Sequence, residues 1–177
     1  QASLHVRSGE IIGLAGLVGA GKTELCKLLF GASQTKSGFL TFKGRTVTFQ
    51  SPYQAVESGL ALIPEERRKE GVMVQESIQT NVTAATLTKH SGPLGWLNQS
   101  AQKKSASKII SDLSIKTPHA DVLVQHLSGG NQQKVAIGKW LATDADVYIF
   151  DEPTKGVDVG ARKDIFTIIH ELAARGK

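Results

Sequence analysis

The stretch Gly16-Leu17-Val18-Gly19-Ala20-Gly21-Lys22-Thr23 decides how the rest of the sequence is interpreted. It matches G-x-x-x-x-G-K-[ST], the phosphate-binding P-loop, in which glycines let backbone N–H groups surround an anion. The apolar run at 11–15 predicts a buried strand before the loop, and the leucines within 25–29 have helical spacing after it. We therefore expect a strand, a glycine loop and a helix whose positive end faces a phosphate group.

Individual residues of the loop receive roles from this motif. Lys22 is expected to hold the β- and γ-phosphates, which also makes it a catalytic candidate, and the Thr23 hydroxyl is expected to ligate Mg²⁺. The residues expected to line the phosphate site are Gly16, Gly19, Ala20, Gly21, Lys22 and Thr23.

Length and composition fit one globular domain. The chain has 177 residues, 40% of them hydrophobic, and a net charge of +5. Because the basic residues are scattered, the charge does not indicate a nucleic-acid partner. The one cysteine, Cys26, excludes an internal disulfide and is expected to lie in the core. No apolar run approaches the ~18 residues that a membrane-spanning helix needs.

Apolar patterning along the chain predicts an α/β architecture. Short strands are expected at 4–6, 39–42, 46–49, 60–63 and 147–150, with 60–63 and 147–150 as buried parallel strands. Helices are expected from Pro52 toward Gly59, within 77–87 and 106–113, and around 165–172. The core is expected to comprise about 1–76 and 142–177, with a mostly helical region at about 77–141 inserted between its strands.

Two acidic residues follow the strand at 147–150. Asp151 and Glu152 have the Walker B arrangement of P-loop enzymes. Asp151 is expected to hold Mg²⁺ through its water shell, and Glu152 to act catalytically as the general base for the attacking water.

A second helix start carries another candidate anion site. Ser128 is a good N-cap, and the residues that follow have helical spacing. The N–H groups of Ser128, Gly129 and Gly130 are therefore expected to be free to bind an anion.

Three stretches resemble one known family, the ATPases of ABC transporters. Leu127–Lys134 resembles their signature motif, and Asp151–Gly160 resembles their Walker B motif and D-loop. The N-Q-Q-K and T-K-G-V-D-V-G runs are similar to bacterial monosaccharide importers, in which one chain holds two tandem cassettes, and Pro64–Arg68 resembles the second cassette. The resemblance implies a single nucleotide-binding domain with a P-loop NTPase, RecA-like core, an inserted α-helical subdomain and a small, partial antiparallel β region.

The resemblance also implies an activity and partners. It implies an ATPase that uses ATP and Mg²⁺ to power monosaccharide import, at the cytoplasmic face of a bacterial membrane. ATP on one P-loop would be completed by Ser128, Gly129 and Gly130 of a second cassette, with Asp158 at the seam. The implied partners are that cassette, in the same full-length chain, the permease subunits, which would contact 77–141, and indirectly an extracytoplasmic sugar-binding protein, but no nucleic acid.

The sequence departs from the family pattern at three points. Glu65 stands where the family has a glutamine, and its carboxylate is expected to reach Mg²⁺ through water. The adenine-stacking aromatic is expected upstream of Gln1, and the switch histidine beyond Lys177. The chain therefore resembles a truncated cassette, and the isolated chain is expected to be nearly inactive.

Other classes of protein remain open at this stage. A non-transport ABC ATPase in DNA repair or translation would predict a coiled-coil arm or a basic stripe. A P-loop GTPase needs an N-K-x-D motif, which Lys155–Asp158 matches poorly. A non-catalytic binding module fits poorly with intact Lys22, Asp151 and Glu152. The sequence does not identify the sugar.

Overall fold

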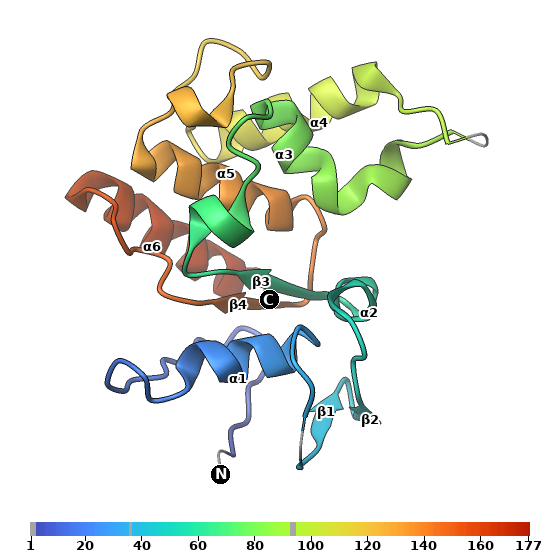
Figure 1. The fold of residues 1–177 in the computed structure, drawn as a ribbon, viewed down its shortest axis with the longest axis vertical. Coiled ribbons are helices and arrows are strands. Elements are labelled where there is room, and N and C mark those ends of the chain that lie inside the picture. Colours follow the sequence, from blue (N-terminus) through green and yellow to red (C-terminus); the bar gives the residue numbers. More distant parts are fainter. Residues whose placement is uncertain (1–2, 36, 93–94) are drawn as a thin grey trace.

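Residues 3–35, 37–92 and 95–177 are described by the computed structural model, and they form helices and short strands (Figure 1). The elements are α1 Lys22–Leu29, β1 Leu40–Phe42, β2 Arg45–Val47, α2 Pro52–Ser58, β3 Leu60–Ile63, η1 Arg67–Gly71, α3 Ile78–Thr83, η2 Ala84–His90, α4 Gln99–Asp112, η3 Val124–His126, α5 Gly129–Leu141, β4 Val147–Phe150 and α6 Val159–Ala174.

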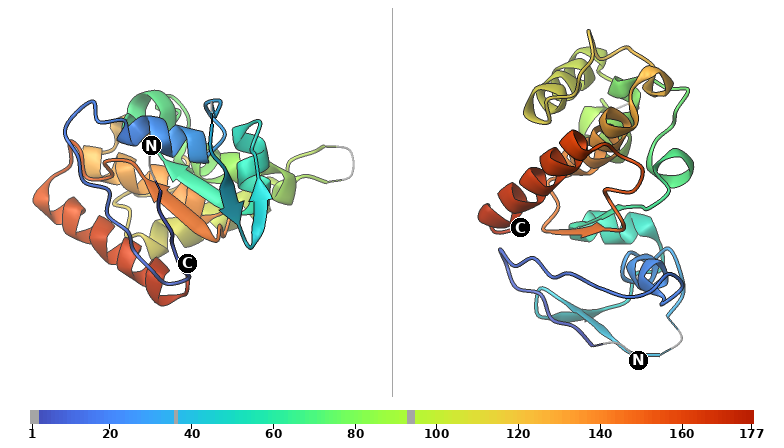
Figure 2. Two further views of the ribbon diagram at one scale, coloured as in Figure 1. Left: turned by 90° about the horizontal axis from the view of Figure 1, so that it is seen from below. Right: turned by 90° about the vertical axis from the view of Figure 1, so that its left-hand side faces the viewer.

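The parallel pair of β3 and β4 lies at the centre of the layers. Its register joins Leu60 to Val147 and Ile63 to Phe150. Helix α1 lies on one side of this pair, and α5 and α6 lie on the other, with α3 and α4 beyond them (Figures 1 and 2). The predicted α/β class, with a mostly helical insertion between β3 and β4, is confirmed.

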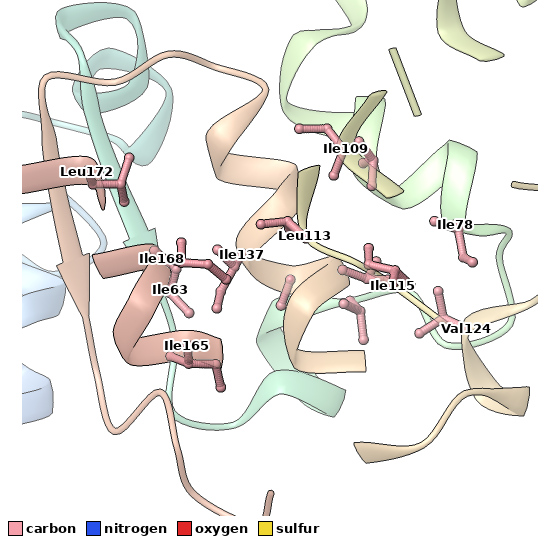
Figure 3. Packing of buried hydrophobic residues seen from close by; sticks show 14 residues of the cluster. Ile63, Ile78, Ile109, Leu113, Ile115, Val124, Ile137, Ile165, Ile168 and Leu172 are labelled. Atoms are coloured by element: carbon pink, nitrogen blue, oxygen red, sulfur yellow. The ribbon is translucent and has the colours of Figure 1, made fainter. Parts of the chain in front are cut away.

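Strand β3 connects two apolar clusters because its side chains alternate between the two faces of the sheet. Leu60 and Leu62 pack with Cys26 of α1, which is buried as expected. Ile63 faces the larger cluster, where Figure 3 shows it beside isoleucines of α5 and α6. Trp140 of α5 contacts both clusters, so the two cores are continuous.

Local signals in the sequence explain the remaining small elements. Strands β1 and β2 form the expected antiparallel hairpin, with Lys43 and Gly44 at the turn. Helix α2 begins at the expected Pro52, with Ser51 as its N-cap, and ends at Gly59 with a φ of 101°. In the described part of the chain, no helix has the length and apolar character needed to cross a membrane.

The strands expected before the P-loop are absent. The segments 4–6 and 11–15 are irregular, and Ile11, Ile12 and Leu14 are 39–49% exposed. A strand persists only where its backbone groups find a neighbouring strand. Here Gly9 N donates to Lys177 O instead, which ties this segment to the end of α6 (Figure 2). The prediction of a buried strand at 11–15 is therefore wrong for this structure.

Helix α5 contacts α4 closely at Gly138, and we expect Gly138→Ala to destabilise the fold. An added Cβ would lie 2.5 Å from Ile109 Cγ2 and 3.2 Å from Leu113 Cδ1. Overpacking outweighs the gain in helix propensity, so the free energy of unfolding should fall by about 1–2 kcal/mol in urea denaturation. Gly13→Ala, where no atom lies within 4 Å of the added Cβ, is the matched control. Equal stability of Gly138→Ala and the parent would contradict this packing.

Candidate functional site

The expected site residues gather where β3 and β4 end. Because the strands are parallel and Ile63 pairs with Phe150, the residues that follow each strand lie at the same edge of the sheet. Glu65 follows β3, and Asp151 and Glu152 follow β4. Asp151 N donates to Ile63 O at 2.9 Å, which extends the pairing into the site.

The glycine loop has the backbone that its sequence predicts. Gly19 has a φ of 81° and Gly21 a φ of 86°, conformations that favour glycine over other residues. Gly21 is the N-cap of α1, and no side chain in the described residues caps this helix end. The loop is open to solvent, since Leu17 is 85% exposed and Val18 is fully exposed. The N–H groups at the start of α1 are therefore accessible to an anion.

Lys22 connects the glycine loop to the acidic residues after β4. Its Nζ donates to Gly16 O at 2.8 Å and lies 3.5 Å from Glu152 Oε1. Glu152 has a φ of 46°, an uncommon backbone conformation for a residue other than glycine. Asp151, the residue before Glu152, is 5% exposed and is therefore buried at the end of β4. The structure thus brings the predicted catalytic residues Lys22 and Glu152 together.

Glu65 contacts both the glycine loop and the segment after β4. Its Oε2 accepts a hydrogen bond from Thr23 Oγ1 at 3.3 Å, and its Oε1 lies 2.5 Å from Lys155 Nζ. The hydrogen bond from Lys155 lowers the pKa of Glu65, which is therefore ionised at neutral pH. Within the described ranges, no three His, Cys, Asp or Glu side chains form a metal-ligand cluster. Thr23 and Glu65 nevertheless place two oxygen donors, the type that Mg²⁺ prefers, beside the loop.

The second candidate anion site is the start of α5. Ser128 is its N-cap, with Oγ 3.0 Å from Asn131 Nδ2. A Cβ on Gly129 would lie 2.9 Å from Arg67 Nη2, and one on Gly130 would lie 2.5 Å from the Cβ of Ala161 in α6. Both glycines therefore permit close approach of neighbouring elements. In the residues described, no hydrogen bond or ion pair joins this helix start to the glycine loop.

Asp158 is the N-cap of α6. Its Oδ1 accepts a hydrogen bond from Ala161 N at 2.9 Å. Backbone N–H groups at this helix start, Ala161 first, lower the pKa of the Asp158 carboxyl. Asp158 therefore has a structural role that the sequence did not indicate, next to Gly130 of α5.

Two residues at the site received no role from the sequence. Lys155 pairs with Glu65, and Arg67 donates from Nη1 to Lys155 O at 2.8 Å and from Nη2 to Gly156 O at 3.1 Å. The only sequence feature that pointed to these two residues was the charge on the two segments that follow the paired strands. Only the fold shows that these segments meet.

A P-loop at a helix start, acidic residues at the end of the adjacent parallel strand and an N-capped Ser-Gly-Gly helix define an ABC-type P-loop NTPase. The family model described as ABC transporter matches residues 1–155, and the chain belongs to this family. The GTPase alternative is therefore discarded.

Similar curated proteins are bacterial sugar-import proteins. The chain is 45% identical over 176 residues to a ribose import ATP-binding protein RbsA of Cereibacter sphaeroides, covering 99% of this chain and 35% of that protein. It is 43% identical to an arabinose import ATP-binding protein AraG of Mannheimia succiniciproducens, covering 97% of this chain and 34% of that protein. The chain thus spans about a third of the length of these relatives.

Solved structures of similar fold are ATP-binding cassettes. The cassette MJ1267 of an ABC transporter aligns with a TM-score of 0.77 at 26% identity, covering 97% of this chain and 69% of that one. A dimeric cassette, MJ0796, bound to ADP and Pi aligns with a TM-score of 0.82 at 19% identity, covering 98% of this chain and 74% of that one. The second likeness shows the fold alone.

The N-cap at Asp158 predicts a pH-dependent contribution to stability. Asp158→Ala should lower the melting temperature at pH 7 by a few degrees, whereas Asp158→Asn should lower it less because asparagine also caps helices. Since the folded pKa is lowered, the contribution is present above the unfolded pKa of about 3.9 and is lost as pH falls through the lower folded pKa. Thermal denaturation between pH 7 and pH 3 measures this, and a pH-independent difference between Asp158→Ala and the parent would contradict it.

Proposed function

We propose that this chain is the ATP-binding and hydrolysing cassette of a transporter that imports a monosaccharide through a membrane permease. The observation that carries the proposal is the set of relatives at 41–45% identity over nearly the whole chain, all named as sugar-import ATP-binding proteins. Their names include ribose, arabinose and galactose, so a pentose or hexose is the expected cargo.

The glycine loop is the proposed nucleotide site. Lys22 Nζ contacts Gly16 O and Glu152. Because both contacts are exposed to solvent, Lys22 can exchange them for the β- and γ-phosphates. Loop N–H groups of Gly19, Gly21 and Thr23 would bind phosphate oxygens. Thr23, Asp151 and, through water, Glu65 are the proposed holders of Mg²⁺, which supplies charge neutralisation when bound.

Hydrolysis needs a base beside the γ-phosphate. Glu152 is the proposed base: its carboxylate takes a proton from water while the water oxygen bonds to the γ-phosphorus and the bond to the β-γ bridging oxygen breaks. The contact between Glu152 and Lys22 supports this, because Lys22 marks where the γ-phosphate would lie. Asp151 is buried at the end of β4, and its oxygen donors are of the type that Mg²⁺ prefers, which supports a metal-holding role.

A second cassette is the proposed partner at the composite site. Among the described residues, Ser128 is hydrogen-bonded to Asn131, Gly129 lies beside Arg67 and Gly130 lies beside Asp158 and Ala161. None of these neighbours belongs to the glycine loop of the same chain, which supports a role toward a partner's nucleotide. We further propose that the helical region at 77–141 contacts the permease, that an extracytoplasmic sugar-binding protein acts with it indirectly, and that the chain works at the cytoplasmic face of the membrane.

Lys22→Ala tests the nucleotide site. Loss of the charged contact to the phosphates removes roughly 1.5–3 kcal/mol, so ATP affinity should fall ten- to a hundredfold in calorimetry, to the limit of detection. Lys27→Ala is the matched control, because Lys27 lies on the same helix but pairs with Glu70. Equal ATP affinity of Lys22→Ala and the parent would refute the P-loop assignment.

Glu152→Gln tests the base and the proposed cargo together. In the intact protein, the variant should retain ATP but hydrolyse it about 10²- to 10⁴-fold more slowly, because an amide cannot accept the proton. Cells in which the only copy of the gene for this protein carries the variant should lose uptake of one labelled monosaccharide among ribose, arabinose and galactose. Unchanged hydrolysis would move the base role elsewhere, and unchanged uptake of all three sugars would favour an ABC ATPase outside sugar transport.

A further inference from the structure

The segment after β3 meets the segment after β4 at the ion pair between Glu65 and Lys155. We propose, on the basis of the function proposed above, that Lys155 is a positioning residue that neutralises Glu65 and thereby sets the affinity of the glycine loop for ATP. The argument rests on where Glu65 lies, on how Lys155 is held, and on the charge that remains if Lys155 is removed.

Glu65 lies at the start of α1, where the phosphates are expected. Its Oε2 is 3.3 Å from Thr23 Oγ1, in the first turn of the helix. A carboxylate at this position partly cancels the positive potential at the start of the helix, and it repels a polyanionic ligand. Glu65 therefore needs a cation close by if the loop is to remain attractive to ATP.

Lys155 is that cation. Its Nζ lies 2.5 Å from Glu65 Oε1 and 3.6 Å from Glu66 Oε1. Lys22 lies in the same loop as Thr23 but donates to Gly16 O and pairs with Glu152. In the described part of the chain, Lys155 is thus the ion-pair partner of Glu65.

The backbone of Lys155 is fixed, unlike that of most surface lysines. The Arg67 guanidinium donates to Lys155 O at 2.8 Å and to Gly156 O at 3.1 Å. Lys155 N donates to Glu152 O at 3.0 Å, which closes the turn. Exposed ion pairs usually contribute little because two mobile side chains must be ordered. Here the segment that carries Glu65 also anchors the backbone of Lys155 through Arg67, so forming the pair requires ordering of the two side chains but not of the segments that carry them.

The charge of the pair predicts a specific pattern. With both residues present, the pair carries no net charge beside the phosphates. Lys155→Met makes the charge beside the phosphates more negative by one unit, Glu65→Gln makes it more positive by one unit, and the double variant leaves it as in the parent. A lysine that only stabilised the turn would give a different pattern, because Glu65→Gln cannot repair a displaced turn.

The experiment measures ATP affinity of the intact protein by calorimetry, in EDTA and in MgCl₂. We expect Lys155→Met to weaken binding about tenfold in EDTA, where ATP carries its full charge, and less with Mg²⁺. In EDTA, where Glu65 holds no Mg²⁺, Glu65→Gln should bind ATP at least as tightly as the parent, and Glu65→Gln with Lys155→Met should return to within about threefold of it. The loss should shrink as salt is raised through roughly 0.5 M, since salt screens exposed charges.

Two further variants separate charge from structure. Lys155→Arg keeps the cation and should keep the affinity. Lys69→Met removes a positive charge from the segment that carries Glu65. Among the described residues Lys69 pairs with Glu66, at 3.7 Å, rather than with Glu65, so the variant should bind ATP like the parent. Melting temperatures within a few degrees of the parent establish that each variant is folded.

The outcomes distinguish this inference from the proposed function. A parent protein that does not bind ATP contradicts both. A parent that binds ATP while Lys155→Met binds equally well, or while Glu65→Gln fails to restore the affinity of Lys155→Met, contradicts the role of Lys155 alone. Equal losses in Lys69→Met and Lys155→Met would show a general charge effect and would also overturn it.

Discussion

The parallel pairing of β3 with β4 is the constraint on which the site depends. Parallel strands end at the same edge, so the register that joins Ile63 to Phe150 also brings Glu65 near Asp151 and Glu152. Helix α1 starts at that edge and adds Thr23 to the group. A shift of this register by one residue would turn Ile63 from the large core toward the opposite face, so core packing and site geometry are selected together.

The segment 64–71 makes polar contacts with α1, with the segment after β4 and with α5. Glu65 and Glu70 contact α1, Arg67 contacts the segment after β4, and Gly71 O accepts a hydrogen bond from Lys139 of α5 at 2.6 Å. Burial lowers the pKa of Lys139 to about 8. These contacts connect the edge of the sheet that carries the candidate site with the helical layer.

Sequence patterns predicted local structure well and long-range pairing poorly. The helix after the glycine loop, the hairpin, β3, β4 and the capped starts of α2 and α5 follow from short signals, and all are present. The strand at 11–15 failed because an apolar run specifies burial but not the neighbour that a strand needs. The roles of Lys155 and Arg67 were missed for a related reason: each depends on a contact between segments about 90 residues apart. The charge of a residue does not predict which distant segment it will contact.

The edges of β3 and β4 that lack a neighbouring strand also affect how this chain behaves toward other molecules. In the described residues, β3 and β4 pair only with each other, so each has one edge without a hydrogen-bonded strand. Ile11, Ile12 and Leu14 are exposed on an irregular segment, and isoleucine has a high β-propensity. Unpaired strand edges with apolar segments nearby are templates for intermolecular β-sheet growth. The net charge of +5 adds a repulsion between molecules that opposes such growth.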